Sequence, residues 1–321
     1  MNGASLPFDT APLALRQRFA LSVAPGQGVP AYEVPVWALT GQARRPRVVV
    51  TAGIHGDEFE GVRAVGRLLH ELAPDTLRGA LVLVPVAHPP AHAARTRTSP
   101  LDGADLNRTF PGDPDGTPTE RLAAALLDGV VADADLLIDL HSGGTRYEFA
   151  PMVGFRTEPD TVAVASHAAA AAFGLPWLWQ MGGDRGVFSY EASRRGMPCL
   201  GMEAGGRGGC RAEDVETMRA GVFNVLRHLG MLPGDALPPP SLPVYAGEWI
   251  LSPATGLWDA RVTLGETVAA GQLLAVILSP EGDTLAALHA PEAGFVGSIR
   301  TFCALDAGDW AITVMTRRVF L

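Results

Sequence analysis

Short apolar runs alternate with segments of helical period along this chain, and the alternation limits its fold more than any other feature. Runs that are apolar on both faces are typical of strands in a parallel sheet covered by helices. The pattern therefore predicts an α/β fold with a mostly parallel sheet flanked by helices. Strands are expected over residues 46–53, 80–87, 134–140 and 197–202. Helices are expected over residues 58–73, 119–133, 162–174 and 212–230.

The pattern changes near residue 232. Residues 232–243 contain five prolines and no periodicity, which is typical of a linker. From Tyr245 onward, short β-type runs are separated by Gly, Pro and Asp turns, so a smaller all-β unit is expected there. We predict two domains, a catalytic domain over residues 1–238 and a C-terminal β domain over residues 239–321.

All 25 basic residues are arginine, because the chain contains no lysine. Schiff-base catalysis, the phosphate-binding lysine of a P-loop and covalent biotin or lipoate are therefore excluded. Residues 262–278 and 289–299 resemble the half-repeats of lipoyl and biotinyl barrels. Without a lysine to modify, this resemblance predicts only a barrel-sandwich-like scaffold.

The net charge is −9 and the isoelectric point about 5.4, which argues against nucleic acid or an anionic membrane surface as a partner. No apolar run is long enough to span a membrane, and the first residues lack the pattern of a secretory signal, so a cytoplasmic location is expected. The three cysteines are scattered, and their spacing indicates neither a disulfide framework nor a thiolate zinc site.

Metal-type side chains directly follow two of the expected strands. His55 lies in the loop after residues 46–53, Glu58 comes three residues later, and His141 follows residues 134–140. The carboxyl ends of parallel strands meet at one edge of a sheet, and three such ligands with a position left for water are the pattern of a catalytic zinc. The alternatives are ordinary loop residues and a histidine that bonds backbone groups at a strand end.

Glu203 follows the expected strand at residues 197–202, and Gly205 and Gly206 come shortly after it. Such glycines let a substrate approach the backbone. A carboxylate in this place can take a proton from zinc-bound water and pass it to a leaving amine. Glu203 is therefore the candidate general base. The alternative is a solvent-facing glutamate on a turn.

The segment 101–112 places Asn107 and Arg108 in a loop bounded by Gly and Pro. Arginine offers a bidentate fork for a substrate carboxylate, and asparagine can bind its other oxygen. Asp105 could accept the free ring N–H of a zinc-binding histidine. The alternative is a polar turn without a role in binding.

Four motifs occur together: HGDE, then DLNR followed by F and PG, then DLHSGG, then E-x-GG. Their order resembles the succinylglutamate desuccinylase/aspartoacylase family, within the wider zinc carboxypeptidase group, over about residues 45–321. The resemblance implies a carboxypeptidase-like α/β fold and one Zn²⁺ per chain. It implies His55, Glu58 and His141 as the zinc ligands and Glu203 as the general base. It implies Asn107 and Arg108 as the clamp for the substrate carboxylate.

Members of that family use a further arginine before the DLNR motif. Arg95 and Arg97 are both candidates. Arg97 is put forward for substrate binding, and the sequence does not decide between the two. His88 stands where relatives often have asparagine, which leaves its role open.

The expected reaction is zinc-dependent hydrolysis of the amide bond of a small N-acyl amino acid. A zinc carboxypeptidase acting on small peptides and a metal-free binding module are the alternatives. No residue identifies the acyl group or the amino acid, and homo-oligomerisation stays open.

Overall fold

The structure is a computed structural model that describes residues 7–10, 12–24, 26, 29–183, 185–235 and 242–318. Most of its strands belong to one 13-stranded sheet. From edge to edge its strand order is β1-β2-β4-β3-β5-β8-β6-β7-β9-β17-β15-β12, and β10 pairs with β17 outside this path. The bounds of its first eight strands are β1 (Leu15–Val23), β2 (Tyr32–Thr40), β3 (Arg47–Ala52), β4 (Ala80–Val84), β5 (Leu136–His141), β6 (Tyr147–Phe155), β7 (Leu178–Gln180) and β8 (Cys199–Gly206).

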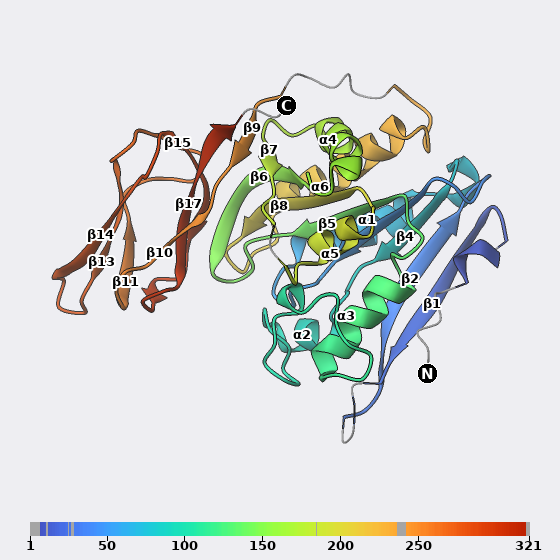
Figure 1. Ribbon diagram of the computed structural model, residues 1–321, viewed down its shortest axis with the longest axis horizontal. Coiled ribbons are helices and arrows are strands. Elements are labelled where there is room, and N and C mark those ends of the chain that lie inside the picture. The colour runs from blue at the N-terminus through green and yellow to red at the C-terminus, as the bar shows by residue number, and fades with distance from the viewer. Residues whose placement is uncertain are drawn as a thin grey trace.

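Helices cover both faces of this sheet (Figure 1). The segments expected to be helical correspond to α1, α3, α4 and α6, whereas α2 and α5 were not expected. Their bounds are α1 (Glu60–Glu71), α2 (Pro89–Ala94), α3 (Pro118–Gly129), α4 (Asp160–Phe173), α5 (Phe188–Arg194) and α6 (Ala212–His228).

The sheet is mixed, so the expectation of a mostly parallel sheet is not confirmed. The four strands predicted from apolar runs are β3, β4, β5 and β8, and these are parallel neighbours at its centre. The flanking strands β2 and β6 run antiparallel to this central group, and β1 runs antiparallel to β2. These strands come from segments without a continuous apolar run, and the sequence analysis did not detect them.

The burial pattern of β3 explains why the central strands read as apolar runs. Val48 and Val50 face a core that also contains side chains of α1, α4 and α6. Val49 faces the opposite core, which contains side chains of α3 and α5. Because consecutive residues point to opposite faces and both faces are covered, consecutive positions such as Val48, Val49 and Val50 are apolar.

The C-terminal strands divide between two sheets. Four of them form a separate sheet, and the others extend the main sheet. Side chains from both groups share one core, which includes Trp258, Ile277, Val296 and Ile312. The bounds in the main sheet are β9 (Val244–Ala246), β10 (Trp249–Leu251), β12 (Thr267–Val268), β15 (Gly294–Arg300) and β17 (Trp310–Arg318); those in the second are β11 (Gly256–Ala260), β13 (Leu273–Leu278), β14 (Thr284–His289) and β16 (Ala304–Leu305).

The main sheet continues directly from the α/β part into the C-terminal part. Strand β15 pairs with β6, and β9 pairs with β7. Figure 1 shows the C-terminal strands beside β6 and β7. The domain boundary predicted between residues 238 and 239 lies outside the described residues, and the division into two domains stays a prediction.

In the described part of the chain, no helix has both the length and the apolar character needed to cross a membrane.

The packing of α4 against α6 gives a test of the fold. A Cβ atom added at Gly221 would lie 1.8 Å from Cε1 of the buried Phe173 ring, whereas one added at Gly66 of α1 meets nothing within 4 Å. We expect Gly221→Ala to lower the free energy of unfolding by about 1–3 kcal/mol through overpacking. Gly66→Ala is the matched control and should raise it by up to about 1 kcal/mol. Urea denaturation measures both; equal effects would contradict the packing of α4 on α6.

Candidate metal centre

The predicted metal-type residues converge at the carboxyl ends of the central parallel strands. His55 follows β3, His141 ends β5, and Glu58 precedes the first turn of α1. His141 also pairs in register with Glu203 on β8. This is the edge at which open α/β sheets gather ligands and catalytic groups.

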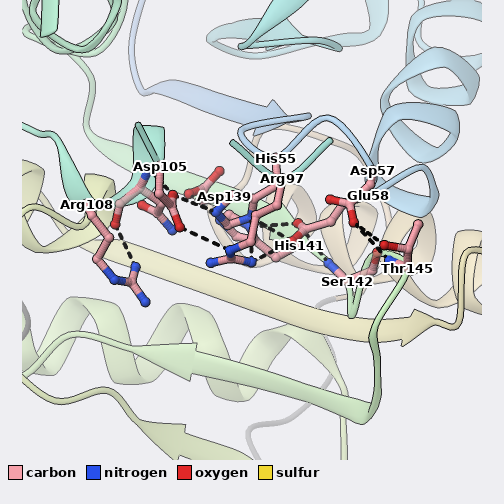
Figure 2. Close-up of polar contacts among 11 residues, drawn as sticks. His55, Asp57, Glu58, Arg97, Asp105, Arg108, Asp139, His141, Ser142 and Thr145 are labelled. Carbon is pink, nitrogen blue, oxygen red and sulfur yellow. Dashed lines mark hydrogen bonds and ion pairs between the residues drawn. The ribbon is translucent and has the colours of Figure 1, made fainter. Parts of the chain in front are cut away.

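The Glu58 carboxylate contacts both imidazole rings (Figure 2). Its Oε1 is 2.6 Å from Nδ1 of His55, and its Oε2 is 2.9 Å from Nδ1 of His141. All three side chains are buried, and their ligand atoms lie within 4.8 Å of one another. Two imidazole nitrogens and one carboxylate form a donor set that suits zinc, so this cluster could hold a metal ion.

The second nitrogen of each ring faces another carboxylate. Nε2 of His55 lies 3.2 Å from Asp105 Oδ1, and Nε2 of His141 lies 2.8 Å from Asp139 Oδ2. Thr51 donates to the other oxygen of Asp139. In the neutral tautomer that binds metal through Nδ1, Nε2–H would donate to these carboxylates and hold the ring orientation.

Asp105, which was put forward from the sequence, lies beside His55, whereas Asp139 was not put forward. A signal for Asp139 was present, because residues two apart on a strand point to the same face and Asp139 precedes His141 by two.

The electrostatics of the cluster favour a cation. Burial alone would raise the pKa of Glu58, but His55 and His141 outweigh it and hold that pKa well below its usual range. Burial alone would lower the pKa of His141, but the carboxylates of Asp139 and Glu58 raise it well above the usual value. Asp105 also has a pKa held far below its usual range, where burial is outweighed by His55 and Arg97. Carboxylates thus surround two imidazoles, a charge balance that a divalent ion fits.

Glu203 lines the same cavity as the cluster but is not part of it. Its Oε2 is buried and has no hydrogen-bond partner among the described residues. Burial raises the pKa of Glu203 well above its usual value; His141 opposes this shift and Glu58 adds to it. An unpartnered buried carboxylate oxygen costs free energy, and such a group in a cavity is a candidate for a functional role.

The predicted substrate residues lie around the same cavity. Arg97 donates from Nε to Asp105 at 3.0 Å, and its Nη1 lies 3.6 Å from Glu58 Oε1. Arg95 has a left-handed backbone, with φ of 58°, and lines only a neighbouring cavity. Of the two arginines, Arg97 is therefore the one beside the cluster.

Asn107 and Arg108 occupy the loop before α3. The backbone N–H of Phe188 donates to Asn107 Oδ1 at 2.9 Å, which fixes the orientation of the side-chain amide. Arg108 donates from Nη1 to the Asn107 carbonyl at 2.7 Å and is exposed (Figure 2). Both residues line the cavity, so the geometry permits the predicted clamp.

The cavity has a volume of about 710 Å³ and is closed on one side by the C-terminal strands. The sequence analysis placed no residue of these strands in the site. It also missed Arg156 and Arg185, two further arginines of the lining. The C-terminal lining consists of Gly247, Glu248, Trp249, Leu251, Trp310, Thr313 and Met315.

Asp57 fixes the loop that follows His141. Its Oδ2 accepts hydrogen bonds from the backbone N–H and the hydroxyl of Thr145, both at 2.9 Å. Gly144 has φ of +54°, and a Cβ atom there would lie 2.6 Å from the same oxygen. Glycine is therefore required at this position, both for the left-handed backbone and for the close approach.

Together the sheet and the buried cluster define a class: α/β proteins with a potential metal site at the carboxyl ends of parallel strands. Residues 44–229 match the family described as the succinylglutamate desuccinylase/aspartoacylase catalytic domain. The chain belongs to this family, as its motifs predicted.

Relatives of known structure or name agree with this membership. An N-alpha-acetyl-L-2,4-diaminobutyric acid deacetylase of Halomonas elongata is 31% identical over 275 residues, which are 82% of this chain and 80% of the relative. A succinylglutamate desuccinylase from Silicibacter sp. TM1040 has a TM-score of 0.86 and 28% identity, over 96% of this chain and 98% of that one. The product-bound ectoine utilization protein of Ruegeria pomeroyi has a TM-score of 0.86 and 28% identity, over 95% and 97%.

His88 lies beneath the loop that carries His55 and gives a test of the electrostatics. It is 1% exposed, and burial lowers its pKa to about 4, although a hydrogen bond to the Ile54 backbone opposes the shift. The folded state therefore binds fewer protons than the unfolded state, and stability should fall as the pH drops from about 6.5 towards 4.

His88→Asn should remove this acid-dependent loss. The difference in free energy of unfolding between His88→Asn and wild type should increase in favour of the variant by up to about 3 kcal/mol from pH 7 to pH 4. Urea denaturation of both proteins at each pH measures this difference. A difference between the two proteins that does not change with pH would show that His88 is not held neutral.

Proposed function

We propose that this protein is a zinc-dependent deacylase that hydrolyses the amide bond of a small N-acyl amino acid. The observation that carries the proposal is the unpartnered oxygen of Glu203, which lines one cavity with the His55–Glu58–His141 cluster. Family membership supports N-acyl amino acid deacylase activity, as does the name of the Halomonas elongata relative.

His55, Glu58 and His141 would hold the zinc ion. Bound zinc supplies Lewis-acid activation of water and of the amide carbonyl. Glu203 then takes a proton from the attacking water and delivers it to the leaving nitrogen. Asp105 and Asp139 hold the two ligand rings in the required orientation through their Nε2 atoms.

Arg97 and Arg108 would bind different parts of the substrate, because they lie at different distances from the His55–Glu58–His141 cluster. Arg97 lies beside Glu58 and His55, close to the place of the reacting carbonyl. Arg108 and Asn107 lie further along the cavity lining and would hold the carboxylate of the amino acid. The substrate is thereby oriented with its amide towards Glu203.

The cavity favours a small substrate over a peptide. Its volume of about 710 Å³ is in the range of small-molecule sites, and the C-terminal strands form one of its walls. A carboxypeptidase needs further room for the preceding residues of its substrate. Cytoplasmic location stays a prediction.

The roles of zinc and Glu203 can be tested by measuring zinc content and kcat in a set of variants. His55→Ala and His141→Ala should lose most of the bound zinc, whereas Glu203→Gln should keep about one zinc per chain and lose about 10²–10⁴-fold in kcat. His289→Ala, which changes an exposed histidine of β14, is the matched control and should alter neither. Stoichiometric zinc in a His55→Ala/His141→Ala double variant would exclude the proposed metal site.

The reaction class can be tested with a panel of substrates, assayed by release of free amine. We expect hydrolysis of N-acetyl or N-succinyl amino acids and little hydrolysis of dipeptides with blocked N-termini. The carboxamides of the same N-acyl amino acids are matched controls; they should react at least about tenfold more slowly, because Arg108 loses a charged hydrogen-bond partner worth about 1.5–3 kcal/mol. Preference for the peptides would instead identify a carboxypeptidase.

A further inference from the structure

Trp310, the first residue of β17, contacts both arginines that the site uses. The guanidinium carbon of Arg97 lies 5.3 Å from the centroid of the indole ring, and that of Arg108 lies 5.5 Å from it. Both distances are within the range of cation–π interactions. Both arginines come from the segment between α2 and α3 of the α/β part, whereas Trp310 comes from the C-terminal part.

The indole ring of Trp310 is itself held in place. Trp249, on the neighbouring strand β10, stacks on it at 5.2 Å with an interplanar angle of 7°. The ring of Tyr147 lies 6.2 Å away. Nη1 of the buried Arg300 donates to the Trp310 carbonyl at 3.2 Å, and Nη2 of Arg300 forms an ion pair with Asp309. Ring and backbone therefore have little freedom to move.

Among the described residues, the polar contacts of the two arginines use only some of their donors. Arg97 bonds Asp105 through Nε, and its Nη1 lies near Glu58 and His55. Arg108 bonds the Asn107 carbonyl through Nη1. A guanidinium group carries five N–H donors, so each retains donors that can face the cavity. An aromatic face attracts the charge without occupying any of those donors, so the contact with Trp310 leaves the remaining N–H groups of both arginines available.

We propose that Trp310 is a positioning residue, which holds Arg97 and Arg108 at a fixed separation so that their free donors meet the substrate. The inference rests on the proposed function, because it assigns these donors to the substrate carboxylate and to the amide oxygen. It also gives the C-terminal strands a part in the reaction: they supply the surface on which the two arginines are oriented.

A role in packing alone would place Trp310 in the core, as is the case for Trp258. Trp258 is 9% exposed and lies in the shared core of the two C-terminal sheets. Trp310 is only half-buried and lines both the catalytic cavity and the neighbouring one. Its aromatic face is thus turned to the site rather than to the core.

The test compares Trp310→Leu with Trp310→Phe, using the N-acyl amino acid that the wild type hydrolyses best. The leucine variant has no aromatic face and should lose about 10–100-fold in kcat/KM, with KM raised and kcat lowered, because both arginines are affected. The phenylalanine variant keeps a face and should recover to within about threefold of wild type. Zinc content should stay the same in both. Equal losses in the two variants, or none in the leucine variant, would overturn the proposal.

Two further comparisons separate positioning from general damage. Trp258→Leu is the matched control: its melting temperature should fall while its folded fraction keeps the wild-type kcat/KM. In an Arg108→Gln background, Trp310→Leu should no longer raise KM and should lower only kcat, because one of its two partners is gone. Fully additive losses would show that Trp310 does not act through Arg108.

A measurement without substrate keeps the test independent of the proposed reaction. The Nε–H signals of Arg97 and Arg108 in the NMR spectrum should shift in Trp310→Leu, because the ring current of the indole is lost, and shift less in Trp310→Phe. If the wild type hydrolyses no N-acyl amino acid, the proposed function fails while these signals still report the contact. Unchanged signals would overturn the positioning role itself.

Discussion

The site depends on the buried carboxylate of Glu58, whose two oxygens each contact one imidazole ring. Glu58 is 3% exposed, and a buried charge without a partner costs several kcal/mol. His55 and His141 stabilise it from the ends of two neighbouring strands, and their own outer nitrogens are held by Asp105 and Asp139. The register of β3 and β5 therefore determines whether the three donors meet at all.

The central strands could be predicted because both faces of the sheet are covered, which forces long apolar runs into the sequence. The flanking strands carry no such signal. In β1 most residues are exposed or half-buried, and β6 contains Pro151, which is uncommon inside a strand. As an edge strand, β1 pairs only with β2 among the described strands, and β6 pairs with β8 and with the distant strand β15. Neither strand needs a continuous apolar run, so the mixed character of the sheet was missed with them.

Residues of the site were predictable where the local sequence alone determines their position. His55, His141 and Glu203 follow apolar runs, and strand ends of a parallel sheet share one edge. The sequence did not decide between Arg95 and Arg97; the contacts of Arg97 with Asp105 and Glu58 distinguish them, and these contacts depend on how the loop folds. Trp310 could not be predicted, because it reaches the site through strand pairing between segments far apart in the chain.

The continuity of the sheet limits how the cavity can open. Strand β15 pairs with β6 over Ser298–Phe149, Ile299–Glu148 and Arg300–Tyr147, and β6 pairs in turn with β8, which carries Glu203. A rigid rotation of the C-terminal strands away from the α/β part would break this ladder and leave backbone groups unpaired, at a cost of about 1–3 kcal/mol for each buried group. Movements of side chains and loops avoid that cost. The wall that contains Trp310 is thus as fixed as the sheet that carries Glu203, which is what a surface for orienting two arginines requires.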